Sequence, residues 1–581
     1  MRRSDCGWTG GISQRMPGLS LCTVIAMMLI LFLAGCQSSP VPSDAQDSCP
    51  LDSATFNGWF QSGTASLNGV VNPANSLNNL APDCGFYQWS QQMFMWLTSP
   101  APSTYGGGAH IFDSPAFYDV SPPDGSGNRT LLAHTPNFIH AFPLRAAKLG
   151  AHRLPIVIDR SGRLIEAKPV DPNLKPMVRD VSGKVIEIAH ARLENGRTIL
   201  LDQEGKVIQT QHVASPMANA DQNNASPVVQ RFLVDNIALF IDPSLAVVDV
   251  EQGQAGDGSV LEAQTTANGS LVYYATMVND VYAYFLTGVK KGAITTVTPN
   301  QFPTTPTDLS NIVNFAMANG KPNPPFPDPN ALAIEVKSSW VLAAGLPNAS
   351  SYITMTATVP TYNQGNPNLW TPTGQQTVQL ALVGIHVVGS TAGHPEMVWA
   401  TFEHTNNTPL GTYSYTKNDG TTNTVTQNTS GTWLFTGSGS NGPFNVAHMA
   451  FTGPNGAPAN SIQSEPTFTI SPSDTLRMFA FGSSDQFENT EVISIDNHVL
   501  QMMPQGDIRG NYFMTGATWT PFGSNPGGGN NGVGTNQLSN STLETYAQGS
   551  NCFSCHQNIN PNLPNVTTDV SHIFAGIQPL F

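Results

Sequence analysis

The chain has 581 residues, and its 39 acidic residues outnumber its 24 Lys and Arg residues to give a net charge of −15. Nucleic-acid phosphates would be repelled by this charge, so we expect no nucleic-acid partner. Charged residues make up only 11% of the chain, while Gly and Pro are abundant at 52 and 45 residues. This composition is typical of exported proteins rich in strands and loops, and it predicts an α+β fold with a β-rich body and a few helices.

The N-terminus carries the features of an export signal. Arg2, Arg3 and Arg15 give it positive charge, and a mostly apolar run follows at 21–33. This run is too short to cross a bilayer comfortably, and its position is typical of the apolar part of a secretion signal. The sequence therefore predicts a signal peptide at 1–35.

The signal ends in Leu33-Ala34-Gly35-Cys36, which resembles a bacterial lipobox. The resemblance implies a lipoprotein signal peptide and a lipid on Cys36; the alternative is a plain signal peptide followed by a coincidental cysteine. Gln37 is not an aspartate, and the sorting pattern of such lipoproteins then favours the outer membrane. Residues 36–50 are expected to form a polar tether to the membrane within the cell envelope.

The seven cysteines divide according to where they lie in the chain. Cys6 and Cys22 are removed with the signal, and Cys36 takes the lipid. Cys49 and Cys84 remain as an even pair in an oxidising compartment, besides two cysteines near the C-terminus. We predict a disulfide between Cys49 and Cys84; the alternative is two thiols that never meet.

The N-terminal segment 51–150 contains one clear helical pattern, at 86–97. Phe86, Trp89, Met93 and Trp96 recur every three or four residues and give the helix an aromatic face. Such a face is more typical of a helix packed in a core than of one that lines a cofactor.

Residues 151–212 contain a motif that occurs three times, at 159–166, 180–187 and 202–209. Each copy has the pattern of a strand, a turn containing Gly, and a second strand, so we predict a β-hairpin repeat that forms a meander. Each turn also contains Asp, which suggests calcium, but one or two carboxylates per turn are few for that ion. The hairpin interpretation is therefore favoured.

The segment 213–520 is predicted to be the β-rich body. Periodicity predicts a helix over 271–285 and strands over 333–341, 378–388 and 397–404. In the last strand the even-numbered residues form an apolar face that includes His404, and the odd-numbered residues are Trp399, Thr401 and Glu403. His386 and His404 are interpreted as hydrogen-bonded core histidines; the alternative is that one of them approaches a cofactor.

Residues 521–540 are uncharged and rich in Gly and Asn, which predicts a flexible linker. The segment 541–581 follows, and it contains Cys552-Phe553-Ser554-Cys555-His556. This spacing is the attachment motif of a c-type haem, in which two thiols bond to one porphyrin and the adjacent histidine binds the iron. The alternatives are a disulfide or a zinc site. We expect one covalent haem c held by Cys552, Cys555 and His556.

Only residues 557–581 follow His556 in the chain, and none of them is methionine. This tail is too short to enclose a porphyrin, so we expect a haem-attachment segment packed on the body and not a stand-alone small cytochrome c fold. His572 is the candidate second axial ligand in the tail. The upstream alternatives are Met502, Met503, Met514, His386 and His404, and the remaining alternative is that the protein supplies no second ligand.

Several stretches resemble a group of bacterial exported cytochrome c family proteins that have a single C-terminal haem motif. They are 540–546, the haem motif itself, 569–574, 382–386, 398–404 and, more loosely, 89–96. The resemblance implies haem binding and electron transfer to an unidentified redox partner, and it indicates no substrate.

We therefore expect a lipid-anchored monohaem electron carrier. One alternative is a haem oxidoreductase similar to a peroxidase or a dehydrogenase, which the large body would accommodate. Another is a haem-containing surface protein with a binding or sensing role. The sequence shows no Gly-rich dinucleotide fingerprint, nucleophile elbow or second haem motif that would favour an enzyme with a second cofactor.

Overall fold

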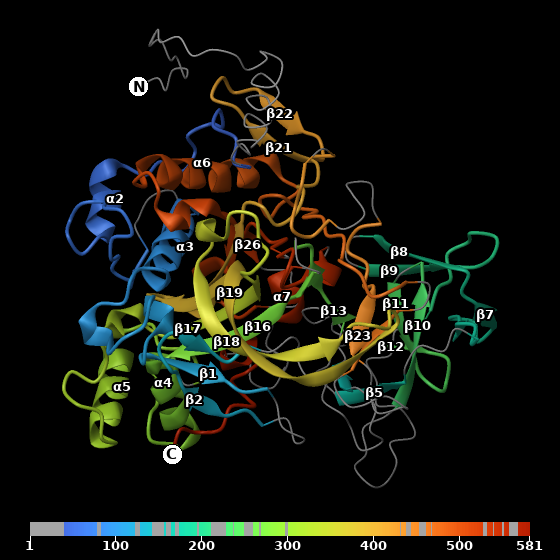
Figure 1. Ribbon diagram of the computed structural model, residues 1–581, viewed down its shortest axis with the longest axis horizontal. Coiled ribbons are helices and arrows are strands. Elements are labelled where there is room, and N and C mark those ends of the chain that lie inside the picture. Colours follow the sequence, from blue (N-terminus) through green and yellow to red (C-terminus); the bar gives the residue numbers. More distant parts are fainter. Residues whose placement is uncertain are drawn as a thin grey trace, which may run out of the picture. The chain divides into compact units, whose positions relative to one another are not determined.

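The fold is given by a computed structural model (Figure 1). It describes residues 40–77, 83–122, 128–141, 156–158, 164–168, 173–194, 197–210, 228–235, 237–248, 259–265, 269–296, 300–429, 431–436, 443–451, 461–465, 468–526, 532–538, 540–548, 551–556 and 567–581. The predicted signal peptide at 1–35 and the predicted lipidation site Cys36 lie outside these residues. Residues Val41–Phe581 form one compact unit.

One large sheet contains most of the long strands, and it has 13 strands in the described part of the chain. Its strands are β1 (Phe117–Val120), β2 (Leu131–Ala133), β3 (Phe138–Ile139), β13 (Ser259–Val260), β16 (Tyr273–Asn279), β17 (Ile334–Leu342), β18 (Thr354–Asn363), β19 (Leu369–Thr391), β20 (His394–His404), β23 (Met449–Phe451), β24 (Ile462–Ser464), β25 (Tyr512–Trp519) and β26 (Val533–Gly534). The predicted strands at 333–341, 378–388 and 397–404 are thus confirmed as parts of β17, β19 and β20.

The 23-residue strand β19 organises this sheet. It pairs antiparallel with β17 along one edge, and with β18 and then β20 along the other. The strand β16 continues the sheet beyond β17, and β25 continues it beyond β20. The predicted β-rich α+β fold is therefore confirmed.

The longer helices cover this sheet and contact one another in two groups. They are α2 (Ser53–Trp59), α3 (Cys84–Leu97), α4 (Asp280–Lys290), α5 (Pro306–Ala318) and α6 (Gln486–Met502). Contacts join α3 to α6 and α2 to α6, and other contacts join α4 to α5 (Figure 1). The helix predicted at 86–97 is confirmed as α3, which is buried along nearly its whole length, as a core helix should be.

The helix predicted at 271–285 is wrong in its first half. Residues up to Asn279 belong to β15 (Ser270–Leu271) and β16, and α4 begins only at Asp280. The side chain of Asn279 accepts a hydrogen bond from the backbone N–H of Tyr282 and so caps the helix start. Because β16 is buried on both faces, its apolar residues do not alternate, and their spacing resembles that of a helix.

The alternation of side chains along β17, β19 and β20 divides the large sheet into two faces. One face packs on α3, where the ring of Phe94 stacks on that of Phe402 with centroids 4.3 Å apart. The opposite face, which we call the tail face, is made of three rows of register partners. These rows are Glu335–Val388–Trp399, Lys337–His386–Thr401 and Ser339–Gly384–Glu403.

The predicted hairpin repeat forms hairpins but not one meander. The strands β4 (Ile156–Ile158) and β5 (Leu164–Lys168) join a five-stranded sheet with β10 (Val228–Val234), β11 (Ile237–Ile241) and β12 (Val247–Val248). Separate two-stranded ladders are formed by β6 (Met177–Arg179) with β7 (Val185–Glu187) and by β8 (His190–Glu194) with β9 (Arg197–Leu201). Because β5 pairs in parallel with β10, which lies far along the chain, the first hairpin belongs to the five-stranded sheet and not to a meander.

The hairpin turns share one geometry, which the carboxylates of Asp180 and Asp202 build. One oxygen of each accepts hydrogen bonds from the backbone N–H groups two and four residues later, at 2.8–3.1 Å. Asp242 makes the same turn. The residue three positions after the aspartate has a positive φ in all three turns: 87° for Gly183, 75° for Gly205 and 66° for Leu245. The sequence did not reveal this further copy because it lacks the glycine. The turn predicted at 159–163 lies outside the described residues.

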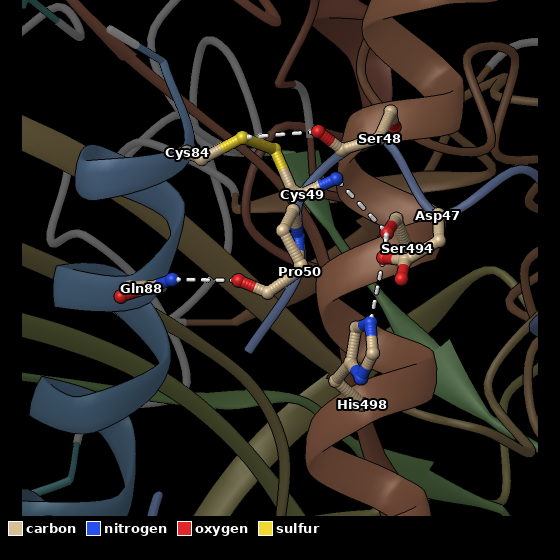
Figure 2. Close-up of a disulfide and its surroundings, with 8 residues drawn as sticks. All are labelled: Asp47, Ser48, Cys49, Pro50, Cys84, Gln88, Ser494 and His498. Atoms are coloured by element: carbon tan, nitrogen blue, oxygen red, sulfur yellow. Dashed lines mark hydrogen bonds and ion pairs between the residues drawn. A yellow bond between two sulfur atoms is a disulfide. The ribbon is translucent and has the colours of Figure 1, made fainter. Parts of the chain in front are cut away.

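A disulfide ties the N-terminal part of the body to α3, as the partition of the cysteines predicted. It joins Cys49 to Cys84, the first residue of α3 (Figure 2). The backbone N–H of Cys49 also donates to Ser494 Oγ on α6, and Gln88 Nε2 donates to the carbonyl of Pro50. The end of the predicted tether is thus fixed between two helices.

The predicted linker at 521–540 is ordered on both sides of residues 527–531, which lie outside the described residues. Val533 and Gly534 form β26 on the edge of β25, and Thr535, Leu538 and Asn540 are buried. Thr535 and Leu538 lie against Gly516, where a Cβ would come within 2.1 Å of Thr535 Oγ1. The described residues on both sides of 527–531 are therefore packed on the body.

Candidate functional site

The motif Cys552–His556 forms one helical turn. Its first four residues are α7 (Cys552–Cys555), and the backbone N–H of His556 closes the turn on the carbonyl of Cys552 at 2.8 Å. Positions three and four residues apart lie on the same side of a helix, so positions 552, 555 and 556 share one side of this turn. The side chain of Cys555 lies outside the description, whereas Cys552 is half-buried against the cluster that contains Phe553 and Trp399.

The imidazole of His556 is held on two sides. Its Nδ1 lies 2.8 Å from the carbonyl oxygen of Val570, and its ring packs on that of Trp399 with centroids 4.3 Å apart. A hydrogen bond from Nδ1–H to a carbonyl fixes the tautomer and assigns the ligand role to Nε2. These contacts come from two distant parts of the chain, because Trp399 lies on β20 and Val570 lies in the tail.

The side chain of His572 is exposed and stacks on His556, with ring centroids 3.8 Å apart and planes 17° from parallel. The structure therefore brings together the two tail histidines that the sequence singled out. Axial ligands on opposite sides of one iron point their nitrogens at each other, which stacked rings do not do. In this orientation His572 fits beside His556 and not opposite it.

Residues 567–581 pack against α4 and the edge of the large sheet. Phe574 lies among Tyr282, Phe285 and Phe302, with ring centroids 5.7–6.1 Å apart. Lys290 of α4 donates to the carbonyls of Ala575 and Ile577, at 3.0 Å for Ala575. Figure 1 shows the C-terminal end of the chain beside α4.

Residues 540–546, which precede the motif, bind the polar rows of the tail face. His386 Nε2 lies 2.9 Å from both carboxylate oxygens of Glu544. Asn540 Nδ2 donates to Thr401 Oγ1 at 3.0 Å, and Glu403 accepts hydrogen bonds from both the backbone N–H and the hydroxyl of Ser541.

Charge complementarity holds this turn on the sheet. Burial opposes the ionisation of Glu544, but the charges of His386 and Lys337 outweigh it and lower the pKa of Glu544. Arg477 forms a buried ion pair with Glu403. The stretches 382–386, 398–404 and 540–546, which carry part of the family resemblance, therefore form one contiguous polar cluster.

The upstream ligand candidates lie in different places. His404 is buried on the α3 side of the sheet, where its ring stacks on Tyr352 at 3.7 Å and burial lowers its pKa to about 3. Met502, Met503 and Met514 pack in the core that contains α3. His386 is the one of these candidates that lies on the tail face with Trp399, and there it pairs with Glu544.

The sequence did not single out Trp399, Val570 or Glu335 as site residues. The alternation over 398–404 placed Trp399, Thr401 and Glu403 together on one face, and this signal pointed to the face that the tail covers. Val570 contacts His556 through its backbone carbonyl, and the type of side chain in a sequence does not show which backbone carbonyl will make such a contact.

Comparisons with known protein families, with curated proteins and with solved structures find no match to this chain. Among the residues that the structure describes, no helix is long and apolar enough to cross a membrane.

Proposed function

We propose that this protein is a lipid-anchored monohaem c-type cytochrome that binds haem covalently and transfers electrons in the cell envelope. Cys552 and Cys555 would form the two thioether bonds, and His556 would bind the iron. The lipid on Cys36 would hold the protein at the outer membrane. The redox partner is a protein whose identity the chain does not indicate.

The observation that carries this proposal is the hydrogen bond between His556 Nδ1 and the carbonyl of Val570. A metal-ligating histidine almost always donates its other ring N–H to a carbonyl, carboxylate or water. Together with positions 552, 555 and 556 on one side of a helical turn, this arrangement fits a haem bound through Nε2 of His556. The haem, when bound, would supply a one-electron couple.

The chain's own residues position the ligand and limit access of water. Val570 fixes the tautomer and the orientation of the imidazole, and Trp399 covers one side of it. The turn at 540–546 and the tail at 567–577 hold the motif from both ends. A haem-attachment segment held in this way would depend on the body and would not be a stand-alone small cytochrome c fold.

His572 remains the candidate second axial ligand, reached by rotation of its side chain away from the stacked position. Its side chain is exposed, and the rotation would give up the stacking on His556. A haem oxidoreductase or a haem sensor would instead keep this position open.

A zinc site is the second candidate, because the imidazoles of His556 and His572 lie together beside a motif with two cysteines, although no set of three ligand atoms close enough to share a metal is found at this place among the described residues. Two thiolates and two imidazoles make a complete tetrahedral zinc shell. In that case the protein would bind a structural metal and transfer no electrons.

Mass spectrometry of the mature protein from an envelope fraction, with zinc analysis of the same sample, separates these functions. We expect one haem bound to the peptide that contains residues 552–556, and no haem on a Cys552→Ala/Cys555→Ala variant. Stoichiometric zinc without haem would overturn the proposal. The optical spectrum of the reduced protein with carbon monoxide then tests the sixth position, because binding would favour an enzyme or a sensor over an electron carrier.

A further inference from the structure

A second set of hydrogen bonds lies directly behind the His556–Val570 contact. Ser571 Oγ donates to Glu335 Oε2 at 2.6 Å, and it lies 2.8 Å from the hydroxyl of Tyr282. Because Ser571 has a single hydroxyl proton and gives it to the carboxylate, Tyr282 is the donor to Ser571. Burial, helped by the charge of Glu335, raises the pKa of Tyr282, so the phenol keeps the proton that it donates.

These contacts join the sheet to the carbonyl that binds His556. The carbonyl of Val570 and the backbone N–H of Ser571 belong to one planar peptide group. The carbonyl of that peptide is held by the imidazole of His556, its N–H reaches the carbonyl of Thr568 at 3.4 Å, and the side chain of Ser571 that follows it is held by Glu335. A displacement of Ser571 would therefore turn the Val570 carbonyl relative to the imidazole.

Glu335 is a charged residue of the tail face that contacts the tail. It is half-buried in the row that contains Val388 and Trp399, and a carboxylate at such a place loses hydration. Its contact with Ser571 lies one residue away from the carbonyl that binds His556.

From this geometry we infer that Glu335 is a positioning residue for the iron ligand, acting through Ser571 and the carbonyl of Val570 on His556. The inference rests on the proposed function, since it concerns the ligand of the proposed haem. A strong hydrogen bond at Nδ1 raises the basicity of an imidazole ligand, which favours the oxidised iron. Loosening it is therefore expected to raise the reduction potential.

The test is the midpoint potential of the full-length haem protein with three variants. Ser571→Ala breaks the link, and we expect it to raise the potential. Ser571→Thr keeps a hydroxyl, and we expect it to restore the wild-type potential. Thr567→Val is the matched control, because it removes another tail hydroxyl that accepts from the backbone N–H of Phe302, and we expect no change in potential.

A double-mutant cycle separates positioning from a simple charge effect. Glu335→Gln removes the charge but keeps an acceptor for Ser571, and if Glu335 acts through Ser571 its shift in potential shrinks in the Ser571→Ala background. Hydrogen exchange at residues 567–577 gives a second readout, and we expect faster exchange in Ser571→Ala than in Ser571→Thr.

An unchanged potential in Ser571→Ala, or a full Glu335→Gln shift in the absence of Ser571, would overturn the inference. These outcomes differ from failure of the proposed function, which shows first as a wild-type protein without covalent haem.

Discussion

The imidazole of His572 stacks on that of His556, with ring centroids 3.8 Å apart, although the segment 557–566 lies between these residues in the sequence. A metal–imidazole bond is about 2 Å long, so two nitrogens on opposite sides of one iron lie about 4 Å apart and face each other. The ring centroids of such ligands lie farther apart than those of the stacked pair, so His572 must turn and move away from His556 to become the second axial ligand.

Replacement of His572 by Ala tests this role. We expect the optical and EPR spectra to change from a six-coordinate low-spin iron to a five-coordinate or water-bound high-spin iron, because the tail offers no other strong ligand. His498→Ala is the control, since His498 is a partly exposed histidine that pairs with Asp47 on another part of the body. Identical low-spin spectra for wild type and His572→Ala would exclude His572 as the ligand.

Replacement of Trp399 by Ala is expected to lower the free energy of unfolding by about 3–5 kcal/mol, since the side chain is buried against His556 and Phe553. We also expect an altered haem spectrum. Trp370→Ala removes an equally buried tryptophan from β19 and should destabilise the protein without altering that spectrum. Urea unfolding followed by circular dichroism measures the first effect, and matching spectra in the two variants would contradict the second.

Gly384 lies where the turn at 540–546 meets the tail face. A Cβ at this position would come within 2.5 Å of Thr542 Oγ1 and 2.8 Å of both Asn540 Oδ1 and Ser339 Oγ. We therefore expect Gly384→Ala to cost about 1–3 kcal/mol of stability through overpacking. Gly58→Ala in α2 meets no atom within 4 Å and should be neutral or stabilising by comparison. Equal denaturation midpoints for the two variants would show that the turn is not packed as described.

The buried imidazole of His134 predicts a loss of stability at alkaline pH. Burial opposes its protonation, but hydrogen bonds to Asp113 and Asp119 at 3.0 and 2.9 Å outweigh this and raise its pKa to about 9. Because the folded pKa exceeds the unfolded value of about 6.5, the stabilisation is fully present below pH 6.5 and is lost as the pH rises through 9.

The difference in pKa corresponds to about 3 kcal/mol. Urea unfolding at pH 6.5 and 9.5 should therefore show a larger loss of stability for the wild type than for His134→Gln. The same pH dependence in both proteins would assign the effect to other groups.

The strands at 333–341, 378–388 and 397–404 and the helix at 86–97 could be predicted because apolar periodicity reports burial of a regular element. The boundary between β16 and α4 could not, because β16 is buried on both faces and its pattern does not alternate. The turn at Asp242 escaped prediction for a related reason: Leu245 takes the left-handed conformation that a glycine would have signalled.

The candidate ligands could be named from the sequence and stay a prediction, whereas the residues around them could not be named. Cys552, Cys555 and His556 belong to one motif, and its spacing is typical of c-type haem attachment. The contact of Glu544 with His386 joins residues 158 positions apart, and that of Ser571 with Glu335 joins residues 236 apart. Such pairs follow from the register of β17, β19 and β20, which no local pattern determines.

The disulfide between Cys49 and Cys84 also determines where a pull on the N-terminal side of the body is felt. Tension applied at residue 49 passes through the sulfur–sulfur bond directly into the first turn of α3, so the chain between the two cysteines is bypassed. The core helix, with the sheet that it covers, resists the pull instead of the chain from residue 50 to residue 83. A pull through the proposed lipid anchor would therefore not unfold the segment that follows Cys49.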